Sequence, residues 1–451
     1  MNKITILIYF SLFFDYSSYC NAAIFVDPND PKVPLKEICS FNIIQYKDCY
    51  LYNGNYLPAA NIPRGLVKYE NRVFLSFPRA DGVPATLAYF DTNEIVNGFC
   101  PKLSPYPSLQ LNSLSHEHES KQLVSVQRFS IDQCKNDKKL WLFDTGSIGS
   151  HKIKGPGLIV ISLKTDTVIR YRALPKDFYS LNSVQGFSKL VVNVVCDDCS
   201  KAYAYIVNHL QGTLTVYSYH EDCFWQFSTT LFKINAYPDS LFQVKTLNNT
   251  EAKYELDIGL WDVSPDNHNK VLLFSARASK HVFTIPYETI HNKSSSILSP
   301  DKYGMKYLGH YNTRGNPGSF SLVPEFQTVF VVQEQNYAVA CWDYQKKLDP
   351  ASVKLVSGNR IFTPFLADMF VDRSHNDLNL VTLSINLAGI VFDDFYDTFL
   401  NFRIYTFNVK EALAVYPECT SVYKPDCQKS HMSYERVGTP TFSTTYKKIM
   451  Y

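Results

Sequence analysis

The sequence predicts an all-β fold, and within that class it favours a β-propeller. Short apolar or alternating segments recur along the chain with turn residues between them, as expected for many short strands. Helical periodicity is scarce, and residues 409–415 form the best short helical segment. The 451 residues contain no Gly/Ser tract, Pro-rich hinge or run of like charge that would separate two domains. Because this length is awkward for a single sandwich or barrel, a propeller is the favoured architecture.

The strand prediction depends on eight segments rich in β-branched and aromatic residues, which suit a pleated sheet. They are residues 72–77, 140–143, 158–162, 204–207, 213–217, 271–274, 328–332 and 380–383. The chain also contains 31 Tyr and 31 Phe, which favour strands and a well-filled interior.

The N-terminus has the pattern of a secretory signal peptide, which we place at residues 1–22. Lys3 supplies a positive start, residues 4–14 are mostly apolar, and the small residues Ala22 and Ala23 form the exit. This apolar run is too short to cross a bilayer, which requires about 20 residues. No later segment has the composition of a membrane helix. We therefore expect a secreted, extracellular protein without a transmembrane segment.

Cysteine usage agrees with export. Of 11 cysteines, one lies at Cys20 within the predicted signal peptide. An even number in an exported chain indicates disulfides, although the pairing does not follow from the count. The ten remaining cysteines are Cys39, Cys49, Cys100, Cys134, Cys196, Cys199, Cys223, Cys341, Cys419 and Cys427.

Two Asn-x-Ser/Thr motifs lie in polar, loop-like stretches. They begin at Asn248 and Asn292. In an exported chain such motifs are acceptors for N-linked glycosylation, which we predict at both positions.

Charge argues against a nucleic-acid partner. The chain has 44 Lys and Arg against 42 Asp and Glu, a net charge of +2, and no basic block. Nucleic-acid binding requires a clustered positive surface, and the sequence predicts none.

One motif resembles an aspartic protease signature. Asp144, Thr145 and Gly146 follow an apolar strand. Protease chemistry of this kind needs two carboxylates that share a proton, and the sequence holds no second Asp-Thr/Ser-Gly. We interpret Asp144 as a strand-end residue that accepts hydrogen bonds in a turn.

No metal site or cofactor is predicted. Cys196 and Cys199 have the spacing of a zinc or redox pair, but no second pair or βαβ setting accompanies them. His116 and His118 lie in a polar stretch that we interpret as a solvated loop. No Gly-x-Ser-x-Gly signature occurs, and the residues single out no catalytic set.

A series of motifs in order along the chain resembles the yellow / major royal jelly protein family. The motifs are residues 65–67, 72–79, 82–87, 100–101, 106–108, 123–126, 131–134, 140–146, 205–208, 259–265, 340–343 and 401–404. They span about residues 60 to 410. The resemblance implies a six-bladed β-propeller over residues 61–415. A segment at 23–60 would close onto it, and 416–451 would form a tail.

The resemblance also implies a disulfide. Position 199 matches a cysteine of the family, and the implied partner of Cys199 is Cys341. Cys196 would then pair elsewhere, and Cys223 is one candidate.

Three functional classes follow from the resemblance: binding of biogenic amines, as in salivary members; dopachrome conversion in melanin formation; and a non-enzymatic role in cuticle, pigmentation or nutrition. The amine binders carry a threonine, an asparagine and a phenylalanine at positions that correspond here to Ala367, Ile385 and Leu387. A shift of one residue would bring in Asn386. A buried ammonium without polar partners is costly, so binding of an amine in the same manner is not expected.

We therefore predict a secreted, non-enzymatic propeller that binds a small ligand in its central channel or has a structural role. Ala367, Ile385, Asn386 and Leu387 are the candidate ligand contacts, and filling the propeller core is an equally strong interpretation of Ile385 and Leu387. A dopachrome-converting isomerase and a salivary amine binder are the alternatives. The sequence leaves the ligand and the oligomeric state open.

Overall fold

A computed structural model gives the fold of the chain. The structure describes residues 31–47, 56–114, 121–135, 137–195, 198–233, 241–245, 251–255, 258–311, 317–374, 377–391 and 395–422. They belong to one compact unit, Pro31–Tyr451. The predicted signal peptide lies outside the described residues.

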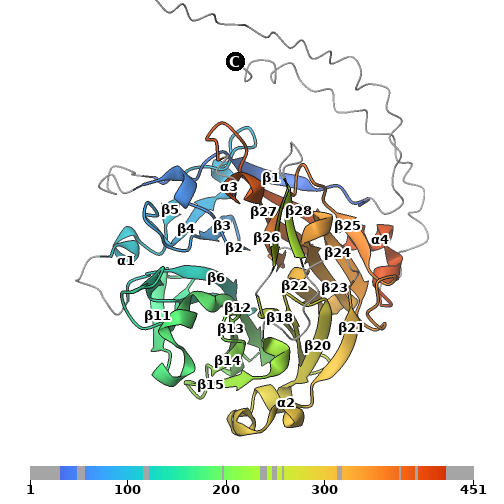
Figure 1. Cartoon of the computed structure of the whole chain (residues 1–451). Coiled ribbons are helices and arrows are strands. Elements are labelled where there is room, and N and C mark those ends of the chain that lie inside the picture. Colours follow the sequence, from blue (N-terminus) through green and yellow to red (C-terminus); the bar gives the residue numbers. More distant parts are fainter. Residues whose placement is uncertain are drawn as a thin grey trace, which may run out of the picture. The chain divides into compact units, whose positions relative to one another are not determined.

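Six four-stranded antiparallel sheets form the blades of a β-propeller, as predicted (Figure 1). The first blade contains β2 (Gly65–Tyr69), β3 (Arg72–Ser76), β4 (Leu87–Asp91) and β5 (Ser104–Pro105). The second contains β6 (Val126–Ile131), β7 (Lys139–Asp144), β10 (Gly157–Ser162) and β11 (Thr167–Ala173). The third contains β12 (Phe187–Val194), β13 (Ala202–Asn208), β14 (Thr213–Ser218) and β15 (Cys223–Ser228).

The remaining blades follow in chain order. The fourth contains β18 (Leu260–Asp266), β19 (Val271–Ala276), β20 (His281–Pro286) and β21 (Lys306–His310). The fifth contains β22 (Pro317–Val323), β23 (Thr328–Gln333), β24 (Ala338–Asp343) and β25 (Lys354–Ser357). The sixth contains β26 (Leu366–Asp372), β27 (Asn379–Ile385), β28 (Phe402–Asn408) and, outermost, β1 (Lys36–Phe41).

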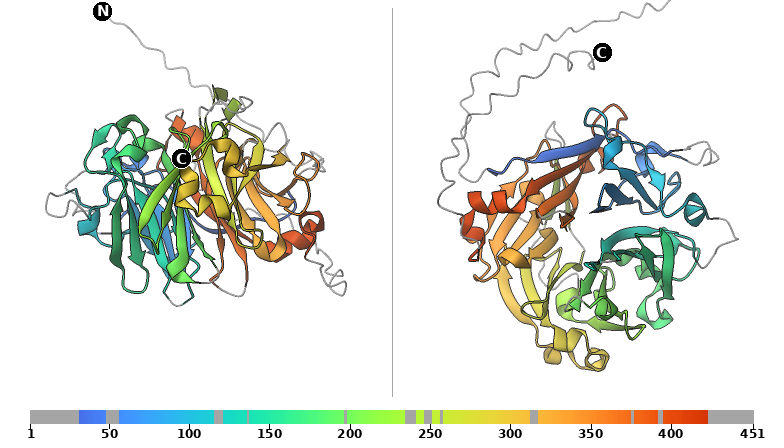
Figure 2. Two further views of the ribbon diagram at one scale, coloured as in Figure 1. Left: turned by 90° about the horizontal axis from the view of Figure 1, so that it is seen from below. Right: turned by 180° about the vertical axis from the view of Figure 1, so that it is seen from behind.

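The N-terminal strand closes the ring. β1 pairs antiparallel with β28, and the rear view in Figure 2 shows the blue strand beside the red one. The sixth blade thus combines both ends of the described chain, because its fourth strand comes from the N-terminal side. The disulfide Cys39–Cys100 ties β1 to the first blade.

Two hairpins and four short α-helices lie outside the six blade sheets among the described residues. The hairpins are β8 (Ser147–Ile148) with β9 (His151–Lys152), and β16 (Leu241–Lys245) with β17 (Glu251–Glu255). The helices are α1 (Leu109–Asn112), α2 (Tyr287–Ile290), α3 (Leu387–Val391) and α4 (Val409–Val415). The predicted helical segment 409–415 is therefore confirmed. Among the described residues, no helix has the length and apolar character needed to cross a membrane.

Apolar side chains hold neighbouring blades together. The described residues form six apolar clusters, and each draws its members from two adjacent blades. Between the first and second blades, for example, Phe74 packs in one cluster with Phe129 and Leu142. Burial of this apolar surface is the main driving force for closing the ring of blades, and it contributes about 25 cal/mol per Å².

The innermost strands enclose a central channel. They are β2, β6, β12, β18, β22 and β26, and each contacts the next around the ring (Figure 1). Five of them, all but β2, contain an irregular register step against their second strand. Such a bulge re-aims a side chain and frees backbone polar groups. These steps set the position of the candidate site.

Candidate functional site

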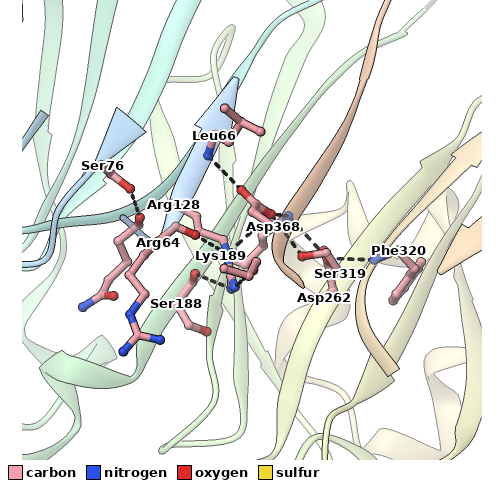
Figure 3. A network of polar contacts seen from close by, with 12 residues as sticks. Arg64, Leu66, Ser76, Arg128, Ser188, Lys189, Asp262, Ser319, Phe320 and Asp368 are labelled. Carbon is pink, nitrogen blue, oxygen red and sulfur yellow. Dashed lines mark hydrogen bonds and ion pairs between the residues drawn. The ribbon is translucent and has the colours of Figure 1, made fainter. Parts of the chain in front are cut away.

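A cluster of four charged side chains and one serine crosses the channel at the level of the bulges (Figure 3). We call it the hub. Each member comes from a different inner strand, and the members are Arg128 of β6, Lys189 of β12, Asp262 of β18, Ser319 of β22 and Asp368 of β26. All of these residues except Lys189 are buried, and only about a tenth of the Lys189 side chain is exposed.

The hub is held by short charged contacts. Lys189 Nζ lies 3.3 Å from Asp262 Oδ2 and 3.2 Å from Asp368 Oδ1. Arg128 Nε lies 3.5 Å from Asp368 Oδ1, and the Ser319 hydroxyl donates to the same oxygen at 3.0 Å. Two cations therefore balance two carboxylates in a nearly dry environment.

Backbone groups complete the network. Asp368 Oδ2 accepts from the Leu66 amide at 3.1 Å, which adds the remaining inner strand, β2. Asp262 Oδ2 accepts from the Phe320 amide at 3.1 Å. Arg128 donates to the carbonyls of Arg64, Ser188 and Ala367. The hub thus links all six blades, and it satisfies backbone groups that the bulges release from the sheet.

Burial shapes the chemistry of one carboxylate. It raises the pKa of Asp262, while Lys189 and Arg128 oppose the rise. A carboxyl group with a raised pKa is suited to accept a proton nearer neutral pH than an exposed aspartate.

A cavity of about 580 Å³ lies between the hub and the turns that follow the inner strands. We call it the lower cavity. Lys189, Asp262 and Asp368 form its inner end. Its wall combines hydroxyl groups with apolar surface, from Ser130, Ser264, Ser321, Val191 and Phe370. This volume falls within the range of small-molecule sites, about 300–1,000 Å³.

Charged residues surround the entrance of the lower cavity. Lys68 Nζ lies 2.7 Å from Asp372 Oδ2. Burial would raise the pKa of Asp372, but hydrogen bonds from Lys68 and Ser374 outweigh it and lower that pKa. Arg373 pairs with Glu325 at 3.2 Å. The entrance is therefore charged and polar, while the wall of the interior combines hydroxyl groups with apolar surface.

The opposite end of the channel is formed by the starts of the inner strands, and we call it the upper mouth. Arg277 donates to Glu334, and both side chains are buried. The guanidinium carbons of Arg277 and Arg128 lie 4.2 and 4.8 Å from the ring centroid of Trp261. Burial, with help from Arg277 and Arg128, lowers the pKa of His209 to about 4. The upper mouth is therefore rich in arginine.

The four candidate ligand contacts lie around the joint of the sixth and first blades. Ala367 and Ile385 are buried members of the apolar cluster there, and Leu387 packs against it. The Asn386 side chain donates to Asn401 and accepts from the Gly389 amide. The structure brings these residues together, and their contact with a ligand stays a prediction.

The predicted disulfide Cys199–Cys341 is wrong. Cys199 is bonded to Cys134 and Cys341 to Cys419. Cys199 lies just before β13 of the third blade, whereas Cys341 lies in β24 of the fifth blade. These two blades are not neighbours, so each cysteine bonds a partner close to its own blade. Cys223 is a free thiol in the described chain. Cys49, Cys196 and Cys427 lie outside the described residues.

Asp144 has the structural role predicted for it. Its carboxylate accepts from the amides of Val124, Ser125 and Gly146 at 2.8–2.9 Å, and Lys154 Nζ lies 3.0 Å away. It is fully buried at the end of β7.

The remaining sequence predictions concern loops. Asn292 is exposed and caps a short 3-10 helix, Lys293–Ile297. Asn248, His116 and His118 lie outside the described residues. Among the described residues, no group of three or more His, Cys, Asp or Glu is placed to hold a metal ion.

Sequence reasoning did not single out the hub. A usable signal was present, because Arg128 and Lys189 each interrupt an otherwise apolar or neutral strand. A lone charge in such a strand points either to solvent or to a buried partner. The sequence does not say which, because the partners lie far away along the chain.

Comparisons with a family model and with individual proteins agree with one another. The family model described as major royal jelly protein matches residues 124–417. Protein yellow of Drosophila subobscura is 27% identical over 402 residues, which covers 85% of this chain and 67% of that protein. The protein named L-dopachrome tautomerase yellow-f of Drosophila melanogaster is 26% identical over 353 residues, which covers 74% of this chain and 79% of that protein.

A solved structure matches only loosely. Virginiamycin B lyase from Staphylococcus aureus has a TM-score of 0.38 at 6% identity, covering 77% of this chain and 95% of that one.

Proposed function

This chain belongs to the major royal jelly protein family, and we propose that it binds a small hydroxylated aromatic molecule in the lower cavity of its central channel. The carrying observation is the cavity of about 580 Å³ that ends on the buried hub. We also propose that the protein is secreted, which three disulfides in the described chain support.

The wall of the lower cavity suits such a ligand. Ser130 and Ser264 accept from backbone amides, which leaves their hydroxyl hydrogens free to point at a ligand. The Phe370 ring is half-buried and offers an apolar surface against which a ring can pack. Asp262 and Asp368 at the inner end provide acceptors for phenolic hydroxyl groups.

Binding of 4-methylcatechol tests the proposal, because this probe is neutral and carries no group that would favour the upper mouth. We expect calorimetry to show a saturable site in the wild type. The variant Ser321→Trp fills the cavity, and Ser321→Leu fills it less in case the larger change prevents folding. Each should weaken binding about tenfold or more.

Thr167→Trp is the matched control, since Thr167 is exposed on the outermost strand β11. It should bind like the wild type. The absence of a site in the wild type, or equal binding by folded Ser321 variants, would contradict the proposal.

Dopachrome isomerisation is the second candidate function. The name of the yellow-f relative and the raised pKa of Asp262 at the inner end of the cavity support it. Isomerisation moves protons within one molecule, so it needs a base and an acid but no oxidant. Asp262 would accept a proton from a ring carbon, and Lys189, 3.3 Å away, would stabilise the charge that develops.

Loss of dopachrome absorbance in the presence of the protein tests this candidate. Acceleration by the wild type, reduced about 100-fold or more in Asp262→Asn, would support catalysis. Our first proposal, a binding protein without this activity, expects no acceleration. Binding of 4-methylcatechol without acceleration would therefore retain the binding function and exclude the isomerase.

A further inference from the structure

The upper mouth contains more positive charge than its own carboxylates balance. Arg64 precedes β2, Arg128 lies in β6 and Arg277 follows β19. The nearby carboxylates are Asp368, which contacts Arg128, and Glu334, which contacts Arg277. Lys189 of the hub adds a fourth cation and Asp262 a third carboxylate, so one cation remains in excess.

Arg64 carries the excess. Among the described residues, no carboxylate pairs with its guanidinium, whereas its carbonyl accepts from Arg128 Nε at 3.2 Å. Figure 3 shows the Arg64 side chain extending away from Asp368. Although the side chain is exposed to solvent, partial desolvation and repulsion from Arg128 and Arg277 lower its pKa to about 10. An accessible cation without a carboxylate partner among the described residues is suited to receive an anion.

Buried polar atoms around the same mouth also lack partners. Within the described chain, Ser188 Oγ, His209 Nδ1 and Glu334 Oε2 accept or donate no hydrogen bond. Such atoms are normally satisfied by protein, water or ligand. Trp261 adds an aromatic surface, part of which stays accessible.

We propose that the upper mouth binds a small organic anion, an aromatic carboxylate, with Arg64 as its main contact. A guanidinium can bind a carboxylate with two parallel hydrogen bonds, and such charge-assisted bonds are stronger than those between neutral groups. The aromatic body would lie near Trp261, and the Ser188 hydroxyl, which has no partner in the described chain, would donate to the anion. This inference does not rest on the proposed function, because Arg64 does not line the lower cavity.

A pair of probes with one ring system and opposite charges tests the inference. Indole-3-acetate carries a carboxylate and tryptamine carries an ammonium. We expect calorimetry to show binding of indole-3-acetate at least about tenfold tighter than that of tryptamine. Equal affinities, tighter tryptamine binding, or no binding of indole-3-acetate would overturn the proposal.

Substitutions locate the site. Arg64→Gln should weaken indole-3-acetate binding about tenfold or more. Arg64→Lys should have an intermediate affinity, because lysine keeps the positive charge but lacks the two parallel N–H donors of the guanidinium. Arg172→Gln is the control, since Arg172 is an exposed arginine of β11 that pairs with Asp222. If Arg64→Gln and Arg172→Gln bind alike, the assignment to the upper mouth is wrong.

Two further measurements separate this site from the lower cavity. Arg64→Gln should bind 4-methylcatechol like the wild type, so loss of only one ligand tells which proposal fails. Inorganic sulfate should compete weakly with indole-3-acetate because it lacks the aromatic body. Competition by sulfate at equal concentration would show a simple oxyanion site and contradict the aromatic part of the inference.

Discussion

Lys189 Nζ lies 3.2 Å from Asp368 Oδ1, and this contact joins the third blade to the sixth across the channel. Together with the contact of Lys189 to Asp262, it makes one lysine the common partner of two buried carboxylates. The hub therefore both links opposite blades and closes the inner end of the lower cavity.

Removing the Lys189 charge is expected to destabilise the propeller strongly. Lys189→Met would leave Asp262 and Asp368 facing each other with one cation fewer, which costs about 3–5 kcal/mol when a buried pair is broken. Urea unfolding measures the change in the free energy of unfolding. Lys47→Met removes an exposed ion pair with Glu94 and should cost about 1 kcal/mol or less. Equal effects of the two variants would mean that the hub does not stabilise the ring.

Two half-buried histidines are expected to make stability fall in acid. Burial lowers the pKa of His291 to about 3, and burial with nearby arginines lowers that of His209 to about 4. A folded-state pKa below the unfolded value of about 6.5 gives stabilisation that is complete above about pH 6.5 and lost as the pH falls toward the folded pKa. Each histidine should contribute a slope of up to about 1.4 kcal/mol per pH unit.

His291→Gln isolates this effect. His291 stacks on Tyr203 at 3.8 Å between ring centroids and lies 2.7 Å from the Tyr205 hydroxyl. The raised pKa values of Asp262 and Glu334 act in the opposite sense, since they favour folding as the pH falls. Between about pH 7.5 and about pH 5, the contribution of His291 is absent from His291→Gln, so its free energy of unfolding should fall less than that of the wild type. An unchanged loss would exclude His291 as a source.

The disulfide assignment is open to direct mapping. Proteolysis without reduction, followed by mass spectrometry, should give peptides that join Cys134 to Cys199 and Cys341 to Cys419. Replacing both Cys341 and Cys419 by alanine should cost about 2–5 kcal/mol, because their bond closes a long loop of chain. A peptide joining Cys199 to Cys341 would restore the pairing implied by the resemblance.

Serotonin is expected to bind weakly or not at all. Ala367, Ile385 and Leu387 present no hydroxyl, amide or aromatic group to an ammonium, and Ile385 is fully buried. The Asn386 amide is already bonded within its loop. Calorimetry should show an affinity far weaker than micromolar, and submicromolar binding would contradict this account.

The strands that sequence could predict are those with two apolar faces. All eight predicted segments lie in second or third strands, namely β3, β7, β10, β13, β14, β19, β23 and β27. Such strands are covered on both sides by neighbouring blades, so they appear as near-continuous apolar runs. None of the eight is an innermost strand, because β6 and β12 carry polar residues that face the channel and contain bulges that break the alternation.

The hub and the disulfides could not be predicted in the same way. Lys189 and Asp368 are 179 residues apart, and only closure of the ring brings them together. The pairing of Cys341 with Cys419 depends on the C-terminal segment, which returns past β24 after the last strand. Local patterns carry no information about such distant contacts. The turn role of Asp144 was predictable because one of its partners, the Gly146 amide, is only two residues away.

A crystal structure of the protein with 4-methylcatechol would locate the ligand site. We expect one ligand in the lower cavity, with its ring near Phe370 and a hydroxyl group directed at Ser264 or at Asp262. A ligand bound at the upper mouth, or a lower cavity that holds only water at saturating 4-methylcatechol, would contradict this expectation.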